Sequence, residues 1–284
     1  MSSRGNKQKI FDNLFPLPKF LEVPAVGVDI SDGSIKFLEL MRRKNRFEVG
    51  HFGEKFLKDG LVSKGEIKDR QGLVSVLKDI KKETGITSAN VSLPEEKAFL
   101  FKVNVPNADD ESVRTNLSFQ IEKKVPISLA EAVFDYDILS NNKKKGDMVS
   151  AVVTVFPGAF VESYLSVFKE AGVEVLSLEI EAQAIARAVT KESDPSTYMV
   201  VDFGHRRSGL AVVSRNVVVY TSTLDVGGDN ITRKIKQILK VTDRDVNKIK
   251  NEIGFTLGEN RELYEAVGST IFALKDEINK HYNY

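Results

Sequence analysis

The chain contains one short pattern twice, and the two copies lie far apart in its 284 residues. The first copy covers residues 27–36 and contains Asp29, and the second covers residues 200–210 and contains Asp202. In each copy an apolar strand pattern ends on the aspartate, a tight turn follows, and a hydroxyl-bearing residue begins the next strand. Internal repetition of this kind predicts two copies of one structural unit.

Each copy opens a run of three strand patterns. We therefore predict two similar three-stranded meanders in opposing lobes, within residues 25–85 and 178–223. Small residues in the turns let main-chain N–H groups approach a phosphate, and a strand-end aspartate can hold a hydrated Mg²⁺. Two such turns facing each other would hold one nucleotide between two lobes. The alternative is that both are ordinary turns, since any meander can carry Asp and Gly there.

The remaining elements follow from apolar periodicity and from capping residues. Strands are predicted at 26–30, 35–41, 47–56, 91–93, 98–105, 133–139, 149–156, 198–203, 208–214 and 217–223. Helices are predicted at 72–83, from a cap at Asp109 or Asp110 to Pro126, at 160–171, at 178–189, after Gly228, at 243–253 and at 261–281. The order within residues 86–176 predicts an α+β module of its own.

Composition excludes several classes of function. The chain has no cysteine, so disulfides, thiolate metal sites and cysteine nucleophiles are excluded. Its three histidines share no metal-ligand spacing, and a net charge of +1 gives no field for nucleic acid. Its basic clusters are short, and we interpret them as solvent-exposed turn residues. No apolar run approaches the roughly 20 residues that span a bilayer, and no signal peptide is visible, so we expect a cytoplasmic protein with no transmembrane segment.

Residues 1–23 have the composition of a tail. They start polar and then become apolar and aromatic, and Pro16 and Pro18 exclude a continuous helix. Two interpretations are open: a short docking or membrane-touching segment, or a tail packed loosely on the domain.

Four motifs, in this order, resemble the actin-like ATPase superfamily and, within it, the PilM family of type IV pilus assembly proteins. They are residues 27–36, residues 181–188, residues 201–204 with Ser208, and residues 227–232. The resemblance covers about residues 24–284. It implies an α/β, actin-like (ribonuclease H-like) two-lobed fold with an inserted FtsA-like α+β subdomain.

The resemblance also implies a division of the chain. An N-terminal tail covers 1–23, the first lobe 24–85, the inserted subdomain 86–176, the connecting helix and loop 177–197, and the second lobe 198–284. The family continues past this length with a glycine-rich loop for adenosine and with closing strands, so we expect a second lobe that is incomplete at its C-terminal end.

The resemblance implies ATP with Mg²⁺ as the ligand, bound weakly or not at all without the adenosine loop. The implied nucleotide-binding residues are Gly27, Asp29, Ser31, Ser34, Lys36, Asp202, Gly204, Ser208, Gly227 and Gly228. Asp29 and Asp202 would hold the metal, and Glu181 and Gln183 are the candidates for catalysis. The helix that carries these last two is interpreted equally well as packing between lobes. Ser31 stands where the family usually has glycine, and an arginine usual before the double glycine is absent.

For function, the resemblance implies a scaffold at the inner face of the membrane, with ATP as a structural or switching ligand. Its partners would be the N-terminal peptide of a PilN-like membrane protein and other components of the pilus platform. Consecutive apolar residues at 98–103 place side chains on both faces of a sheet. We therefore predict a peptide groove where the 86–176 module joins the first lobe. The alternative is that the first lobe buries this surface completely.

Two alternatives remain open. The first is an enzyme of the same superfamily, an active ATPase or a small-molecule kinase, which needs a general base and a substrate pocket. The second is an FtsA-like division protein, which would carry an amphipathic membrane helix at its C-terminus. We expect at most slow ATP hydrolysis.

Overall fold

The computed structural model describes residues 25–43, 46–139, 144, 147–191, 194–253 and 261–282, and the tail predicted over 1–23 lies outside them. The chain forms two compact units. The first contains Met1–Ser196 and Val213–Tyr220, and the second contains Thr197–Val212 and Thr221–Tyr284.

The first unit is built on a five-stranded sheet of order β10-β6-β1-β2-β3. Its strands are β1 (Val26–Ile30), β2 (Ser34–Arg43), β3 (Arg46–Phe56), β6 (Ser88–Leu93) and β10 (Glu174–Ile180). The meander β1-β2-β3 is antiparallel, as predicted, whereas β6 runs parallel to both β1 and β10. A short hairpin, β4 (Val62–Ser63) with β5 (Glu66–Ile67), follows β3.

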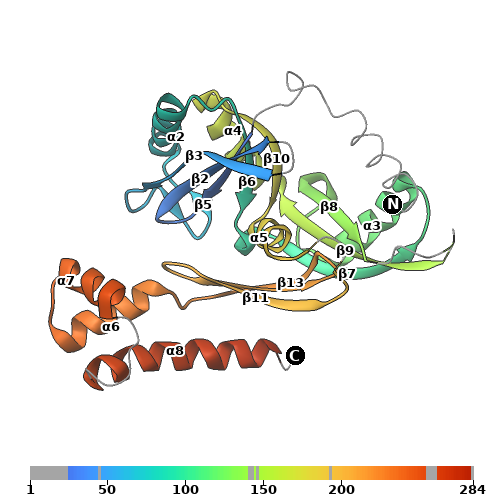
Figure 1. Cartoon of the computed structure of the whole chain (residues 1–284). Helices are drawn as coiled ribbons and strands as arrows, with labels where there is room; N and C mark the ends of the chain where they lie inside the picture. Colours follow the sequence, from blue (N-terminus) through green and yellow to red (C-terminus); the bar gives the residue numbers. More distant parts are fainter. Residues whose placement is uncertain are drawn as a thin grey trace. The chain divides into compact units, whose positions relative to one another are not determined.

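Two helices lie side by side on one side of this sheet, α2 (Arg70–Thr84) and α4 (Gly158–Ala171) (Figure 1). Asp69 caps α2 by accepting a hydrogen bond from the Gly72 N–H at 2.9 Å. Gly85 and Gly172 end the two helices in the left-handed conformation, with φ of 72° and 74°, as the glycine stop signals predicted.

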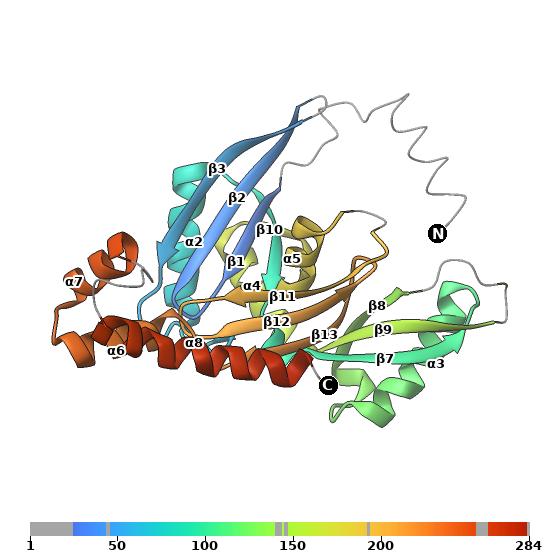
Figure 2. The same ribbon diagram turned by 60° about the horizontal axis from the view of Figure 1, so that its bottom comes forward.

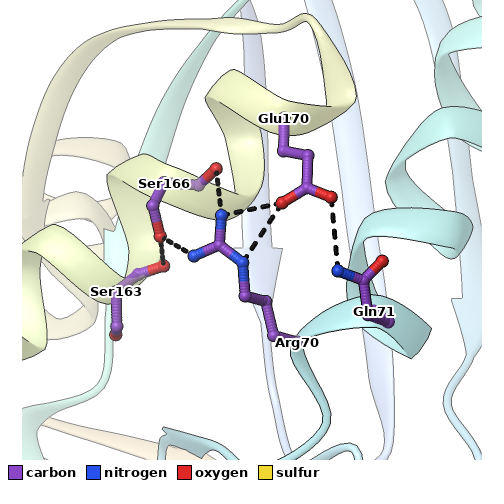
Figure 3. Close-up of polar contacts among 5 residues, drawn as sticks. All are labelled: Arg70, Gln71, Ser163, Ser166 and Glu170. Carbon is purple, nitrogen blue, oxygen red and sulfur yellow. Dashed lines mark hydrogen bonds and ion pairs between the residues drawn. The ribbon is translucent and has the colours of Figure 1, made fainter.

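An exposed polar network also joins α2 to α4 (Figure 3). The Arg70 guanidinium donates to one oxygen of the Glu170 carboxylate at 2.7 and 3.1 Å, and it reaches Ser166 as well. Gln71 donates to the other Glu170 oxygen at 3.4 Å. Because Arg70 donates to it, the pKa of Glu170 lies below its usual range. The network aligns the start of α2 with the end of α4.

A second sheet, of order β7-β9-β8, stands apart from the first. Its strands are β7 (Phe99–Pro106), β8 (Ala132–Ile138) and β9 (Met148–Pro157), and α3 (Asp110–Lys124) covers one face. Asp109, one of the two predicted caps, accepts from the Ser112 N–H at 2.9 Å and begins α3. The core between helix and sheet contains Val105, Val113, Leu117, Ile121, Val149, Ala151, Val153 and Val155. Short 3₁₀ turns at Glu95–Lys97 and Leu129–Glu131 flank the sheet.

Two expectations for this region differ from the structure. The element order predicted for residues 86–176 is present, but β6 and β10 pair within the first sheet and only β7, β8 and β9 form the separate one. The helix predicted over 178–189 is wrong at its start, because residues up to Ile180 belong to β10 and α5 covers Glu181–Val189. Both differences have one cause: β6 and β10 run parallel, and periodicity does not reveal which distant strand a segment pairs with.

Three strands, β11 (Thr197–Phe203), β12 (Ser208–Ser214) and β13 (Val217–Leu224), form a separate sheet in the order β11-β12-β13. The predicted second meander is therefore present and does not continue the first sheet. Arg215 and Asn216 join β12 to β13 with φ of 54° and 65°, the type I′ turn that suits a two-residue hairpin.

The second unit continues with helices α6 (Gly228–Leu239), α7 (Asp243–Lys248) and α8 (Arg261–Tyr282) and a π-helical turn at Ile249–Ile253. Ile235, Val246 and Val267 form its core, with Ile231, Leu239, Val241 and Ile249 packed around them. In the described part of the chain, no helix combines the length and the apolar character needed to cross a membrane.

Candidate functional site

The first repeated turn closes on the hydroxyl group of Ser31. This hydroxyl donates to the Ser34 carbonyl at 3.1 Å and accepts from the N–H groups of Gly33 and Ser34 at 3.4 and 3.2 Å. The Ser31 N–H also donates to the Ser34 carbonyl, at 2.9 Å. The Ser31 side chain therefore closes the turn through contacts within residues 31–34.

Asp29 ends β1 and lies between two side chains from neighbouring strands. In the register it is opposite Lys36 of β2 on one side and Ser92 of β6 on the other. The Ser92 hydroxyl donates to the Asp29 carboxylate at 2.5 Å. The carboxylate is half-buried and held in place, which is the geometry needed to orient a hydrated cation. Ser92 was not a predicted site residue, because only the β1–β6 pairing shows that it neighbours Asp29.

Asp32 anchors this turn to the β4–β5 hairpin. Its two carboxylate oxygens accept from the N–H groups of Lys64 and Gly65, each at 3.1 Å. The carbonyl of Gly65 in turn accepts from the hydroxyl of Tyr164 in α4, at 2.7 Å. Asp32 therefore has a structural role that the sequence did not indicate: it connects the first turn to the β4–β5 hairpin.

Tyr164 marks a point where acidic groups gather. It is fully buried, and this burial is the first cause that raises its pKa. The carboxylates of Glu96, Asp29, Asp32 and Glu181 raise it further. Glu181, one of the two catalytic candidates, therefore lies in the same electrostatic environment as the first turn. If a phosphate were bound at the first turn, these carboxylates would favour a bridging cation over direct contact with it.

Gln183, the other catalytic candidate, is used in packing. Its amide oxygen accepts from the Val218 N–H and its amide nitrogen donates to the Asn216 carbonyl, both at 3.4 Å. These contacts hold α5 against the tip of the β12–β13 hairpin. The packing interpretation of this helix thus accounts for Gln183, whereas Glu181 remains a candidate.

The second repeated turn, in the second unit, packs against the start of α6. The Gly228 N–H donates to the Gly204 carbonyl at 3.0 Å, and the Asp229 N–H donates to the His205 carbonyl at 2.7 Å. A Cβ atom on Gly227 would lie 2.7 Å from the His205 oxygen and from the Arg206 carbonyl carbon. Glycine is required at 227 because two main-chain segments meet there.

Ser208 has a structural contact in place of the predicted phosphate contact. Its side chain is fully buried, and its hydroxyl donates to the Val226 carbonyl at 2.6 Å. The hydroxyl proton therefore joins β12 to the segment that leads into α6. Any phosphate at this turn would be held by main-chain N–H groups, as in other turn-based anion sites. Asp202, at the end of β11, is exposed.

The predicted site residues thus fall into two groups. Gly27, Asp29, Ser31, Ser34 and Lys36 lie together on β1, on β2 and in the turn between them, in the first unit. The second group, in the second unit, consists of Asp202, Gly204, Ser208, Gly227 and Gly228. No group of three or more His, Asp or Glu side chains among the described residues could hold a metal by itself. A Mg²⁺ shared by Asp29 and Asp202, with ATP between the turns, therefore stays a prediction.

Comparison with known proteins gives a family and a fold. The family model described as "Type IV pilus assembly protein PilM" matches residues 27–266. A solved "PilM-PilN type IV pilus biogenesis complex" is 18% identical, with a TM-score of 0.75 over 91% of this chain and 76% of that chain.

Two further solved structures are similar. Ethanolamine utilization protein EutJ from Carboxydothermus hydrogenoformans is 17% identical, with a TM-score of 0.57 over 98% of this chain and 79% of that one. MreB5 of Spiroplasma citri bound to AMPPNP is 12% identical, with a TM-score of 0.53 over 90% and 78%. At such identities these likenesses show the fold alone, and they confirm the predicted actin-like fold.

Proposed function

The chain belongs to the family of the type IV pilus assembly protein PilM, and on that premise we propose that it is a cytoplasmic scaffold which binds a PilN-like membrane protein. Family membership gives the chain a role in type IV pilus assembly. In the proposed function, the N-terminal peptide of the partner lies in a groove of the β7-β9-β8 sheet. The partner then holds the scaffold, with other platform components, at the inner face of the membrane.

The observation that carries the proposal is the face of the β7-β9-β8 sheet opposite α3. Alternation along the strands puts Leu100, Thr154 and Asp135 in one row of that face, and Lys102, Val152 and Asp137 in the next. These rows combine apolar side chains with charges. An extended peptide laid over such a face would place alternate side chains into it.

The cover over this face is partial. Phe156 is buried and stacks on Phe160 of α4, with ring centroids 5.7 Å apart. Val152 is buried as well, whereas Val133 of β8 is 50% exposed. The exposed apolar side chain of this face is therefore on the β8 side, where Val133 shares the face with Asp135 and Asp137. On the β7 side, Lys102 is exposed. Because β8 is an edge strand, a peptide could also pair with its main chain.

The charge on the β8 side favours a peptide with a basic residue. The pKa of Asp137 is raised, first by burial and then by the nearby Asp135 carboxylate. Arg114 of α3 already lies 3.5 Å from the Asp135 carboxylate, so a further cation beside Asp137 would stabilise the ionised form of Asp137. We therefore propose that a basic side chain, or the amino terminus, of the partner peptide lies next to Asp137.

ATP with Mg²⁺ would act as a structural or switching ligand of this scaffold. The first turn supports this part of the proposal, because Asp29 is held by Ser92 and Lys36 lies opposite it in the register. The enzyme alternatives need a general base. Gln183 has only a neutral amide, which bonds to the β12–β13 hairpin, so Glu181 is the candidate for a general base that these alternatives retain.

The test is a fluorescence anisotropy titration with the labelled N-terminal peptide of a PilN-like membrane protein. We expect saturable binding that is unchanged in Asp29→Ala and Asp202→Ala, since neither residue lies in the β7-β9-β8 sheet. If the purified protein binds no peptide but hydrolyses ATP at about 1 per second or faster, the scaffold proposal is wrong and the enzyme alternative is favoured.

A further inference from the structure

The β2–β3 hairpin extends beyond the rest of its sheet. β1 pairs only with Ile35–Glu39 of β2, whereas β2 and β3 stay paired up to Arg43 and Arg46. The last part of the hairpin is therefore a two-stranded ribbon, and Figure 2 shows it running past the end of β1. A ribbon of two strands is only marginally stable without something packed against one face.

One face of this hairpin is apolar and exposed. Opposed residues of an antiparallel pair point to the same side, and the register joins Leu38 to Phe52 and Leu40 to Val49. A register shift, or β-bulge, between Leu38 and Leu40 places both pairs on the same face of the hairpin. We call the set Leu38, Leu40, Phe47, Val49, Phe52 and Phe56 the apolar hairpin face; its exposure ranges from 42% at Leu38 to 81% at Phe56.

The opposite face of the same strands is already packed. Ile35 and Phe37 are buried on that side, together with Val26, Val28 and Ile30 of β1. The apolar hairpin face is therefore the second, unmatched side of the meander. Six large apolar side chains gathered on one surface mark a docking site rather than a solvated surface.

The segment of the chain that enters the sheet at this place has matching chemistry. Residues 1–24 lead directly into Ala25 and β1, and Val26 pairs with Glu39, between Leu38 and Leu40. The segment carries the apolar residues Ile10, Phe11, Leu14, Phe15, Leu17, Phe20, Leu21 and Val23. Pro16 and Pro18 favour an extended conformation over a helix.

The length of the segment is sufficient. Residues 10–24 can span about 50 Å when extended, and the ten residues of β2 cover about 33 Å. The segment begins one strand spacing from the apolar hairpin face, so it is present there at a high effective concentration. A second copy of the chain or another protein has no such advantage.

We propose that residues 10–23 dock in an extended conformation on the apolar hairpin face of their own chain. The phenylalanine and leucine side chains of the segment cover those of β2 and β3. The segment thereby completes the packing of the ribbon and is a fixed part of the first unit. This selects between the two interpretations of the tail: it packs on the domain, and it is not a free docking arm.

Cross-linking in the full chain tests the proposal cleanly, since the chain has no cysteine of its own. The test pair is Phe15→Cys with Leu40→Cys, and the control pair is Phe15→Cys with Phe119→Cys. Leu40 and Phe119 are similarly exposed, at 53% and 61%, but Phe119 lies on α3. With a short bis-maleimide we expect at least about tenfold more intrachain product from the test pair than from the control pair.

A second measurement covers the case in which the cysteine at 15 disturbs docking. Maleimide should label the cysteine of Leu40→Cys about tenfold faster when Phe11→Ser and Phe15→Ser are added. The two serine changes weaken docking of the segment, so the cysteine is covered for less of the time. Three results would overturn the proposal: mainly interchain product, equal yields from the two pairs, or a labelling rate that the serine changes leave unaltered. The first of these would make a second copy of the chain the occupant.

Discussion

The hydroxyl group of Tyr164 donates a hydrogen bond of 2.7 Å to the main-chain carbonyl of Gly65, inside the first unit. Gly65 also donates through its N–H to Asp32 in the first repeated turn. Its own φ is 71°, and a Cβ atom there would lie 2.5 Å from the Pro94 ring. One glycine thus joins the candidate phosphate turn, α4 and the segment that leads into the β7-β9-β8 sheet.

Loss of this contact should destabilise the first unit. Tyr164→Phe leaves the Gly65 carbonyl without its donor in a buried place, so we expect a decrease of about 1–3 kcal/mol in the free energy of unfolding. Chemical denaturation measures it. Tyr282→Phe, at a position 74% exposed on α8, is the matched control and should leave the free energy unchanged. Equal stabilities for the two variants would show that the bond contributes nothing.

Gly227→Ala should destabilise the second unit. The added Cβ would meet main-chain atoms of His205 and Arg206 at 2.7 Å, so the turn and the start of α6 must separate. Overpacking of this kind costs about 1–3 kcal/mol, measurable by thermal or chemical denaturation. Gly33→Ala is the control, because a Cβ there meets nothing within 4 Å. A Gly227→Ala protein as stable as Gly33→Ala would contradict the close approach.

Alkaline pH should weaken the β7-β9-β8 region through Tyr136. Burial, followed by the hydrogen bond to Asp110, raises the pKa of Tyr136 from 10.0 to about 12. A folded-state pKa above the unfolded value gives stability that is complete below pH about 10 and is lost as the pH rises through about 12. Tyr136→Phe should therefore lose less stability than the parent between these values. In an absorbance titration of tyrosinate, the Tyr136→Phe protein should lack one tyrosine ionisation at high pH that the parent shows. If that ionisation is unchanged in the variant, it belongs to another tyrosine.

Nucleotide binding should depend on the two repeated aspartates. If Mg²⁺ lies between them, Asp202→Ala should weaken Mg·ATP binding by about 1–3 kcal/mol, the size of one charge-assisted contact. Isothermal calorimetry measures this, and Asp276→Ala on α8 is a control with an exposed aspartate. Equal affinities of Asp202→Ala and the parent would remove Asp202 from the site. We expect the parent affinity itself to be weak.

The repeated strand-aspartate-turn pattern predicted both meanders, and capping residues located α2, α3 and α4 closely. These features are local, since strand alternation and a cap depend on neighbours in the sequence. What the sequence did not indicate depends on pairing between distant segments. Ser92 approaches Asp29 only because β6 runs beside β1. Leu178 was assigned to the alanine-rich helix that follows it in the sequence, whereas its parallel pairing with β6 makes it part of β10.

The same limit applies to the candidate site. Ser31 and Ser34 could be placed in one turn from the sequence, and they are in one turn. The structural role of Ser208 could not be predicted, because its hydroxyl group donates a hydrogen bond to the Val226 carbonyl, which lies on a later segment of the chain. Gln183 likewise meets Asn216 and Val218 only after the β12–β13 hairpin has formed.

The central claim is that the β8 side of the β7-β9-β8 sheet binds a partner peptide. The most direct measurement is the affinity of the labelled PilN-like peptide for two matched variants, Val133→Arg on that face and Phe119→Arg on α3. Both positions are at least half exposed, at 50% and 61%, so neither change empties the core. The account predicts binding weakened about tenfold or more by Val133→Arg, a loss of about 1.4 kcal/mol, and unchanged by Phe119→Arg. Equal affinities for both variants, or a loss confined to Phe119→Arg, would contradict it.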